Sequence, residues 1–98
     1  MEKMSVKYEL MLIIRSDLEE KIVSNLFDKI NKLIVSGGGK VLSQDSWGKK
    51  VFPRPVKKFR EGLYFLFTFT LPPSGLSNLD KKVKIEEQVI RYLITKRS

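Results

Sequence analysis

The sequence predicts an α+β fold in which one four-stranded antiparallel sheet carries two helices on one face. Along the chain, the apolar residues alternate between a period of two and a period of about 3.6, in the element order β-α-β-β-α-β. This order divides into two β-α-β halves of similar size, which together form a ferredoxin-like sandwich. The first and third strands are central in such a sheet, and those two segments are the most apolar of the strand-like segments here.

The first strand and the first helix have the clearest periods. The segment KYELMLII, residues 7–14, predicts a strand, and its expected core face consists of Tyr8, Leu10, Leu12 and Ile14. Apolar residues then recur at helical spacing in residues 15–36, which predicts an amphipathic helix. Ser16 and Glu19 have the S-x-x-E spacing of a capping box, and the glycines from Gly37 to Gly39 are expected to end the helix.

The rest of the chain is expected to form a second strand, a third strand, a short helix and a fourth strand, in that order. That second strand begins at KVLSQDSW, residues 40–47, and is expected to run towards Phe52 and to end ahead of Pro53. EGLYFLFTFTL predicts the third strand, whose expected core residues are Leu63, Phe65, Phe67 and Phe69. After the turn residues PPSG, a short helix is expected with Leu76, Leu79 and Val83 on its core face, and QVIRYLITK then predicts the fourth strand.

The composition excludes most kinds of catalytic site. The chain has 98 residues, the size of one domain, which is expected to span residues 1–98. It contains no cysteine and no histidine, so disulfides, thiolate or imidazole metal sites and histidine-dependent triads are excluded. Phosphate-binding and nucleophile motifs do not occur. We therefore expect a protein that is not an enzyme and that has no metal, no cofactor and no small-molecule substrate. An enzyme based on arginine, lysine and carboxylates is the remaining alternative.

The charge balance points to a polyanionic partner. There are 19 Lys and Arg residues against 11 Asp and Glu residues, a net charge of +8. Nucleic acid is the first candidate partner, an anionic membrane surface is the second, and solubility alone is the simplest alternative. The N-terminus lacks the pattern of a signal peptide, and no apolar run approaches the roughly 20 residues that span a bilayer. We expect a soluble protein that stays in the cytoplasm and has no membrane partner.

The segment WGKKVFPRPVKKFREG, residues 47–62, is the candidate binding segment, and its part from Pro53 to Arg60 is expected to form a loop. Its basic residues are Lys49, Lys50, Arg54, Lys57, Lys58 and Arg60. Such side chains contact phosphates, and arginine can also stack on bases. Arg91 is a second basic point, expected on the open face of the sheet if Ile90 and Tyr92 face the core. The alternative is a charged hairpin edge whose lysines prevent strand-to-strand aggregation.

An aromatic platform for stacking RNA bases, as in RNA-recognition modules of the same element order, is not favoured. Three phenylalanines of the third strand belong to its expected core face, so only Tyr64 of this strand remains for the open face. The candidate contact surface is therefore the basic segment and the open face of the sheet around it.

Several segments, in this order and spacing, resemble one known family over nearly the whole chain. They are YELMLII, LEEKI, the glycine helix stop, WGKK, PVKK, EGLYFLFTF and EEQVIRYLITK. In these segments the chain resembles the sixth small-subunit ribosomal protein of bacteria. The resemblance implies a ferredoxin-like fold and a structural role in the small subunit. It also implies binding to the central domain of the small-subunit (16S) rRNA, together with the eighteenth small-subunit ribosomal protein.

The family's segment WGKRRLAYPI maps onto residues 47–56 without a gap, and Arg91 matches an arginine of the family's last strand. The resemblance implies that the basic residues named above bind RNA. It implies that the residues binding the protein partner include Trp47, Phe52, Pro55 and Val56. Val51, Pro53 and Arg54 depart from the family's arginine, small residue and tyrosine, and we expect no contact from the longer C-terminal tail of many members. A protein–protein module without direct RNA contact is the alternative function.

Overall fold

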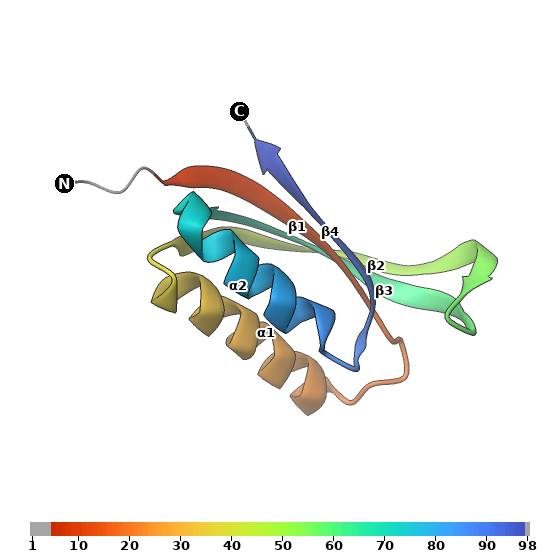
Figure 1. Cartoon of the computed structure of the whole chain (residues 1–98). Helices are drawn as coiled ribbons and strands as arrows, with labels where there is room; N and C mark the ends of the chain where they lie inside the picture. The colour runs from red at the N-terminus through yellow and green to blue at the C-terminus, as the bar shows by residue number, and fades with distance from the viewer. Residues whose placement is uncertain (1–4, 98) are drawn as a thin grey trace.

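The computed structural model describes residues 5–97 and has the predicted element order. The strands are β1 (Val6–Ile14), β2 (Lys40–Val56), β3 (Phe59–Leu71) and β4 (Val89–Arg97), and the helices are α1 (Glu20–Ser36) and α2 (Pro73–Lys84). The strands form one antiparallel sheet in the order β2-β3-β1-β4. Both helices cover one face and leave the other face open (Figure 1). The ferredoxin-like α+β sandwich is therefore confirmed, including the central position of the first and third strands.

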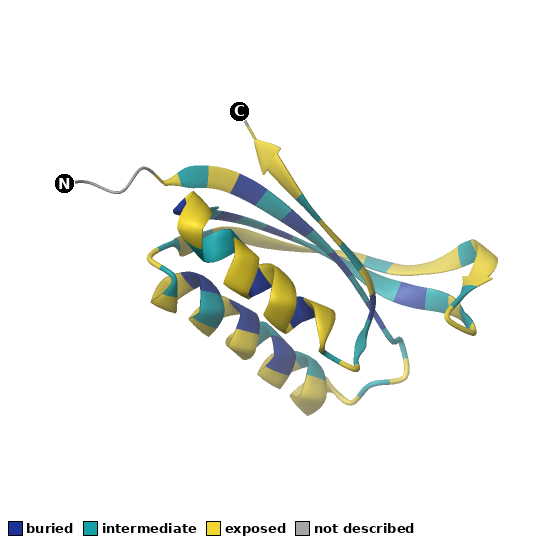
Figure 2. Cartoon of the chain, in the orientation of Figure 1, coloured by how far each residue is buried: buried dark blue, intermediate teal, exposed yellow. Residues whose placement is uncertain are grey.

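The core lies between the helices and the covered face of the sheet, where buried positions alternate along β1 and β3 (Figure 2). The buried side chains include the four predicted for the first strand, Tyr8, Leu10, Leu12 and Ile14. On β3, Phe67 and Phe69 are fully buried, while Leu63 and Phe65 are partly buried against the same cluster. The ring of Phe27 on α1 meets Phe65 and Phe67 edge to face, with centroid distances of 4.7 and 5.2 Å. The period-two pattern therefore identified the correct face of both central strands.

The predicted capping box is wrong. Helix α1 begins at Glu20 with Glu19 as its N-cap, and Glu19 makes no side-chain capping bond. Ser16 lies in the turn before the helix, where its hydroxyl donates to a carboxylate oxygen of Glu61, 2.8 Å away. The S-x-x-E spacing matches the capping-box motif, but the Ser16 hydroxyl is hydrogen-bonded to Glu61, which lies 45 positions away in the sequence, and not to the helix N-terminus. The predicted helix stop is confirmed: α1 ends before Gly37, and Gly38 has a φ of +94°, which favours glycine.

The segment expected as a loop is a hairpin arm, so the expected end of the second strand ahead of Pro53 is also wrong. Strand β1 pairs with β3 only as far as Leu63, whereas β2 and β3 continue past that point to Val56 and Phe59. We call residues 49–62 the arm; Figure 1 shows this hairpin projecting away from both helices. The prolines are accommodated because β2 is an edge strand and because the ladder has no pairs between Val51 and Val56.

Neither helix within residues 5–97 is long and apolar enough to cross a membrane. The longer one, α1, is amphipathic: its buried residues are Leu26, Ile30 and Ile34, and polar side chains occupy its outer face.

Candidate nucleic-acid and protein interface

The tip of the arm is a two-residue turn made of Lys57 and Lys58. Both have a left-handed backbone, with φ values of +50° and +72°. A two-residue hairpin turn needs this geometry, which Asn-Gly adopts most readily. For other residues a left-handed backbone costs roughly 1–2 kcal/mol each. Strain of this kind is typical of positions that are kept for a function, and here it presents two exposed ammonium groups at the end of the arm.

Replacing the tip by Lys57→Asn with Lys58→Gly is expected to raise the free energy of unfolding by about 1 kcal/mol. Asparagine and glycine adopt the left-handed turn at lower cost than lysine, and no buried contact is lost because both lysines are exposed. Urea unfolding followed by circular dichroism measures the change. The control is Lys57→Ala with Lys58→Ala, which removes the same charges and keeps the strain. If this control gained as much stability, charge repulsion rather than backbone strain would be the cause.

One side of the arm continues the open face of the sheet. There the Phe52 and Tyr64 rings lie 6.3 Å apart, and the Lys50 ammonium lies 5.9 Å from the Tyr64 ring centroid. A shallow cavity of about 310 Å³ is lined by Ile13, Phe52, Pro53, Arg54, Val56, Tyr64 and Arg91. These residues come from all four strands, so the fold brings predicted site residues of β2 together with one of β4.

Arg91 lies on the open face, as predicted. Its neighbour Ile90 is only 1% exposed and faces the core, while the Arg91 side chain is exposed and lines the open-face cavity beside Arg54. The two guanidinium groups thus share one hollow with two aromatic rings. Guanidinium groups bind phosphate oxygens and also stack on planar rings, so this hollow suits a nucleotide.

A second hollow on the open face, of about 330 Å³, is mostly apolar. Its lining consists of Glu9, Met11, Trp47, Leu66, Leu93 and Thr95. Met11 pairs with Leu66 on one side and Leu93 on the other, and Leu93 and Trp47 are 62% and 50% exposed. Exposed apolar side chains that adjoin in this way mark interaction surfaces. We call Met11, Trp47, Leu66 and Leu93 the open-face stripe.

Sequence reasoning identified only one member of this stripe, Trp47. The signal for the others was present, because apolar residues occupy both alternating faces of the first strand and the outward positions of the third and fourth. The missing information was the register between the strands, which sets Met11 of β1 beside Leu66 of β3 and Leu93 of β4.

The side of the arm that faces away from the open face carries a polar cluster. Lys49 belongs to this cluster, whereas Lys50 lies beside Tyr64 on the open-face side. The Lys49 ammonium lies 3.4 Å from a Glu61 carboxylate oxygen that also accepts the Ser16 hydroxyl bond. Nearby, Arg15 pairs with Asp17 at 2.9 Å and lies 5.4 Å from the ring centroid of Phe59. The predicted basic residues therefore occupy both sides and the tip of the arm rather than one patch.

The Ser16 hydrogen bond, and after it the hydrogen bond and charge of Lys49, lower the pKa of the Glu61 carboxyl. A lowered pKa stabilises the folded state at pH values above the group's ordinary value of 4.5, and this contribution is lost as the pH falls through the folded-state pKa. The hydrogen bond of Arg15 lowers the pKa of Asp17 in the same direction.

Glu61→Gln is accordingly expected to cost stability at about pH 7 and to cost less at about pH 3, because the wild-type carboxyl takes up a proton as the pH falls through its folded-state pKa. Urea unfolding at both pH values gives the two differences. Lys49→Met is the control: because Ser16 still donates to Glu61, it should reproduce only part of the pH dependence. An equal cost of Glu61→Gln at both pH values would contradict the role assigned to this carboxylate.

The fold and this surface define a class of protein: a basic binding module on a ferredoxin-like scaffold. Within residues 5–97, no three Asp, Glu, His or Cys side chains gather as metal ligands. The profile of the ribosomal protein S6 family matches residues 7–96. The chain belongs to the ribosomal protein S6 family.

The chain is similar to proteins of this family over most of their length. The chain is 44% identical to the small ribosomal subunit protein bS6 of Symbiobacterium thermophilum, over 92% of this chain and 95% of that one. It is 42% identical to the protein of the same name from Moorella thermoacetica, over 91% of each chain. The crystal structure of the 30S ribosomal protein S6 of Thermotoga maritima superimposes with a TM-score of 0.88 at 27% identity, covering 96% of this chain and 89% of that one.

A more distant structure shares only the fold. The P2 domain of the chemotaxis kinase CheA from Thermotoga maritima, solved with the response regulator CheY, has a TM-score of 0.60 at 13% identity and covers 96% of this chain and 100% of that one. Family membership confirms three predictions made from the sequence. The chain is a structural, non-enzymatic protein of the bacterial small ribosomal subunit, it is part of a ribonucleoprotein with rRNA, and it is located on the ribosome in the cytoplasm.

Proposed function

We propose that the basic residues of the arm, together with Arg91, bind the central domain of 16S rRNA and that the apolar residues of the open face bind the eighteenth small-subunit ribosomal protein. The observation that carries this proposal is the strained tip, where Lys57 and Lys58 occupy turn positions that local preference would give to other residues. Two ammonium groups held at the end of a projecting hairpin support the proposal, because they would reach phosphates that lie beyond the body of the protein.

The RNA contacts are expected to be mainly to phosphates. The residues proposed for them are Lys49, Lys50, Arg54, Lys57, Lys58, Arg60 and Arg91. Side chains cannot read base edges in the deep, narrow major groove of an RNA helix, so such contacts position the arm on the backbone. The hollow that holds Arg54 and Arg91 beside Phe52 and Tyr64 suits one unpaired base, stacked on an aromatic ring or a guanidinium plane.

The protein contact is proposed for the open face. Trp47 and Leu93 are large, exposed and adjacent to Met11 and Leu66, and buried aromatic and aliphatic anchors of this kind dominate interface energies. Phe52 and Val56 extend the apolar surface into the first hollow, and Pro55 lies exposed beside them on β2. The RNA surface and the protein surface therefore adjoin along β2, which would let one partner order the residues that the other contacts.

The departures from the family pattern fit this division. Arg54, where the family has a tyrosine, lines the hollow together with Arg91 and supplies a group that can both stack and bind phosphate. Pro53 lies in the unpaired part of the β2 ladder, so its missing backbone donor removes no ladder bond. Val51 is 76% exposed, and its pairing with Glu61 places it on the side of the arm away from the first hollow.

Sedimentation of tagged protein from a bacterial lysate on a sucrose gradient tests the RNA part of this proposal. We expect co-migration with small subunits and release after ribonuclease treatment. The second candidate function, a protein–protein module without RNA contact, is favoured by the exposed Leu93 and Trp47. Binding of a protein partner by a chain that shows no binding to a central-domain rRNA fragment would establish that alternative and refute RNA binding.

A further inference from the structure

We propose that the turn between β1 and α1 braces the arm, so that Arg15 and Ser16 are positioning residues for RNA binding. The turn consists of residues 15–19 and directly follows β1. This role rests on the proposed RNA contact of the arm, and it adds two residues that lie outside the arm and act through it.

The outer part of the arm has few contacts of its own. Past Leu63, where the pairing of β3 with β1 ends, the arm consists of β2 and β3 alone. Their ladder is interrupted after the pair of Val51 with Glu61. It resumes only at the pair of Val56 with Phe59, next to the tip. Because an isolated two-stranded hairpin is marginally stable in water, this ladder alone would leave the direction of the arm poorly fixed.

The turn contacts the arm at both ends of this gap in the ladder. Phe59 and Glu61 lie two residues apart on β3, so their side chains share one face. The Ser16 hydroxyl donates to a Glu61 carboxylate oxygen 2.8 Å away. The Arg15 guanidinium lies 5.4 Å from the centroid of the Phe59 ring, within the range of a cation–π contact. The two residues of β3 that border the gap are therefore the two that the turn holds.

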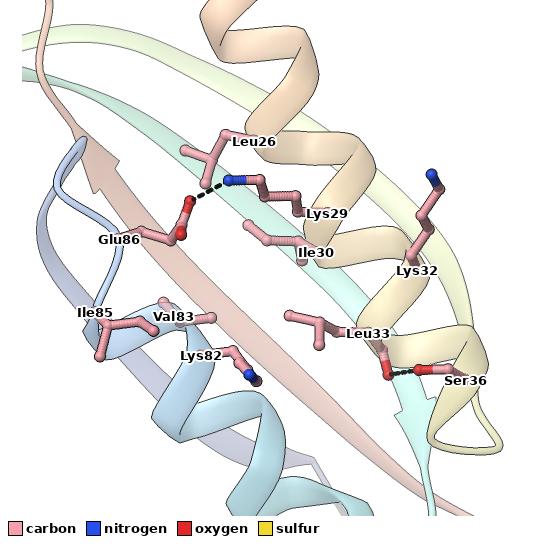
Figure 3. A pocket seen from close by; sticks show the side chains of 10 residues that line it. All are labelled: Leu26, Lys29, Ile30, Lys32, Leu33, Ser36, Lys82, Val83, Ile85 and Glu86. Carbon is pink, nitrogen blue, oxygen red and sulfur yellow. Dashed lines mark hydrogen bonds and ion pairs between the residues drawn. The ribbon is translucent and has the colours of Figure 1, made fainter.

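The turn is itself fixed to the body of the protein. Two hydrogen bonds, of 3.1 and 2.9 Å, hold the Arg15 guanidinium on the Asp17 carboxylate. The Arg15 amide donates to the Gln88 carbonyl, 3.0 Å away, in the segment that joins α2 to β4. Figure 3 shows Lys29 of α1 reaching Glu86 of the same segment, with 3.3 Å between ammonium nitrogen and carboxylate oxygen. The contacts of the turn therefore tie the arm to the segment between α2 and β4, and through it to α1.

An arm with a fixed direction binds RNA at a lower entropic cost. Lys57 and Lys58 at the tip are then held at a constant separation from Arg91 on the open face. No freedom of the arm has to be lost when the tip and the open face contact the same RNA. Loss of the brace is expected to lower the affinity without removing a charge. Loss of a phosphate contact, in contrast, also lowers the salt dependence of binding.

Ser16→Ala tests the positioning role at constant net charge. In the free protein, amide NMR relaxation is expected to give order parameters of about 0.85 for the wild-type arm and values falling towards about 0.6 in the variant. The affinity for a central-domain rRNA fragment is expected to fall about fivefold, while the slope of log affinity against log salt concentration stays unchanged. Ser16→Thr keeps the hydroxyl and should restore both the order parameters and the affinity. Adding Phe59→Leu to Ser16→Ala removes the ring beside Arg15, again without a change of charge, and should enlarge both effects.

Ser36→Ala is the matched control. It also removes one serine hydrogen bond, to the Leu33 carbonyl 3.3 Å away, but at the opposite end of α1 from the turn. It should change neither the arm nor the RNA affinity, and an equal effect of Ser36→Ala would overturn the positioning role.

The two readouts separate this role from the proposed function. An arm that stays as ordered in Ser16→Ala as in the wild type would overturn the brace and leave the RNA contact of the arm standing. A looser arm with unchanged RNA affinity would overturn the positioning role alone. If the wild type did not bind the fragment, the proposed function would fail, and the positioning role would fail with it.

Discussion

A variant with Lys49, Lys50, Lys57 and Lys58 replaced by alanine is expected to bind a central-domain rRNA fragment about 100-fold more weakly than the wild type at near-physiological salt. Each lysine that neutralises a phosphate releases condensed cations, so the loss of four also lowers the slope of log affinity against log salt concentration by about three. Fluorescence anisotropy with a labelled fragment at several salt concentrations measures both quantities.

The control for this variant has to remove the same charge from elsewhere. Lys21, Lys81, Lys84 and Lys96 are exposed and lie outside the arm. Their replacement by alanine keeps the net charge equal to that of the arm variant and should lower the affinity far less. If both variants lost affinity and salt slope equally, the general positive charge of the protein would be responsible, and the arm would not be the binding site.

Gly39→Ala is expected to destabilise the fold by about 3 kcal/mol, as much as many large-to-small core changes. Gly39 lies where the chain turns from α1 into β2, and a Cβ atom there would overlap the backbone carbonyl of Thr70 on β3. The neighbour is backbone and cannot rotate away, so the start of β2 would have to shift from its partner strand. Urea unfolding of the variant measures the loss.

Gly48→Ala provides the comparison for that prediction. A Cβ at Gly48 meets nothing within 4 Å, but the residue has a φ of +81°. Alanine there should cost only about 1 kcal/mol from backbone strain. A loss at Gly39 no larger than at Gly48 would show that the close approach of Thr70 is relieved easily, and the account of this junction would be wrong.

The fold was predictable because its signals are local. The face of each central strand follows from alternation within about ten residues, and the glycines of residues 37–39 mark the end of the helix. The arm was not predictable in the same way. Pro53 and Pro55 are strong local signals for a loop, and they are overridden because β2 lies at the edge of the sheet, which is a property of the whole topology.

The residue types of the candidate site were predictable from the sequence, but the arrangement of these residues in space was only partly predictable. The basic residues of the arm are evident in the sequence, but their distribution over two sides and a tip depends on register shifts in the β2–β3 ladder. The pairing of Ser16 with Glu61 and that of Lys29 with Glu86 join residues 45 and 57 positions apart. The periodicity of a single element cannot reveal such contacts, so the polar cluster of the arm and the contact of α1 with Glu86 appear only in the folded chain.

The central claim is that the basic residues of the arm bind RNA while the apolar residues of the open face bind the protein partner. The most direct measurement compares the four-lysine arm variant with an open-face variant, Trp47→Ser with Leu93→Ser, whose side chains are exposed enough to be replaced without loss of the core. Each is titrated separately with the rRNA fragment and with the eighteenth small-subunit ribosomal protein. We predict crossed losses: the arm variant loses RNA and keeps the protein, and the open-face variant does the reverse. Parallel losses in both variants, or an arm variant that binds RNA as tightly as the wild type, would contradict the claim.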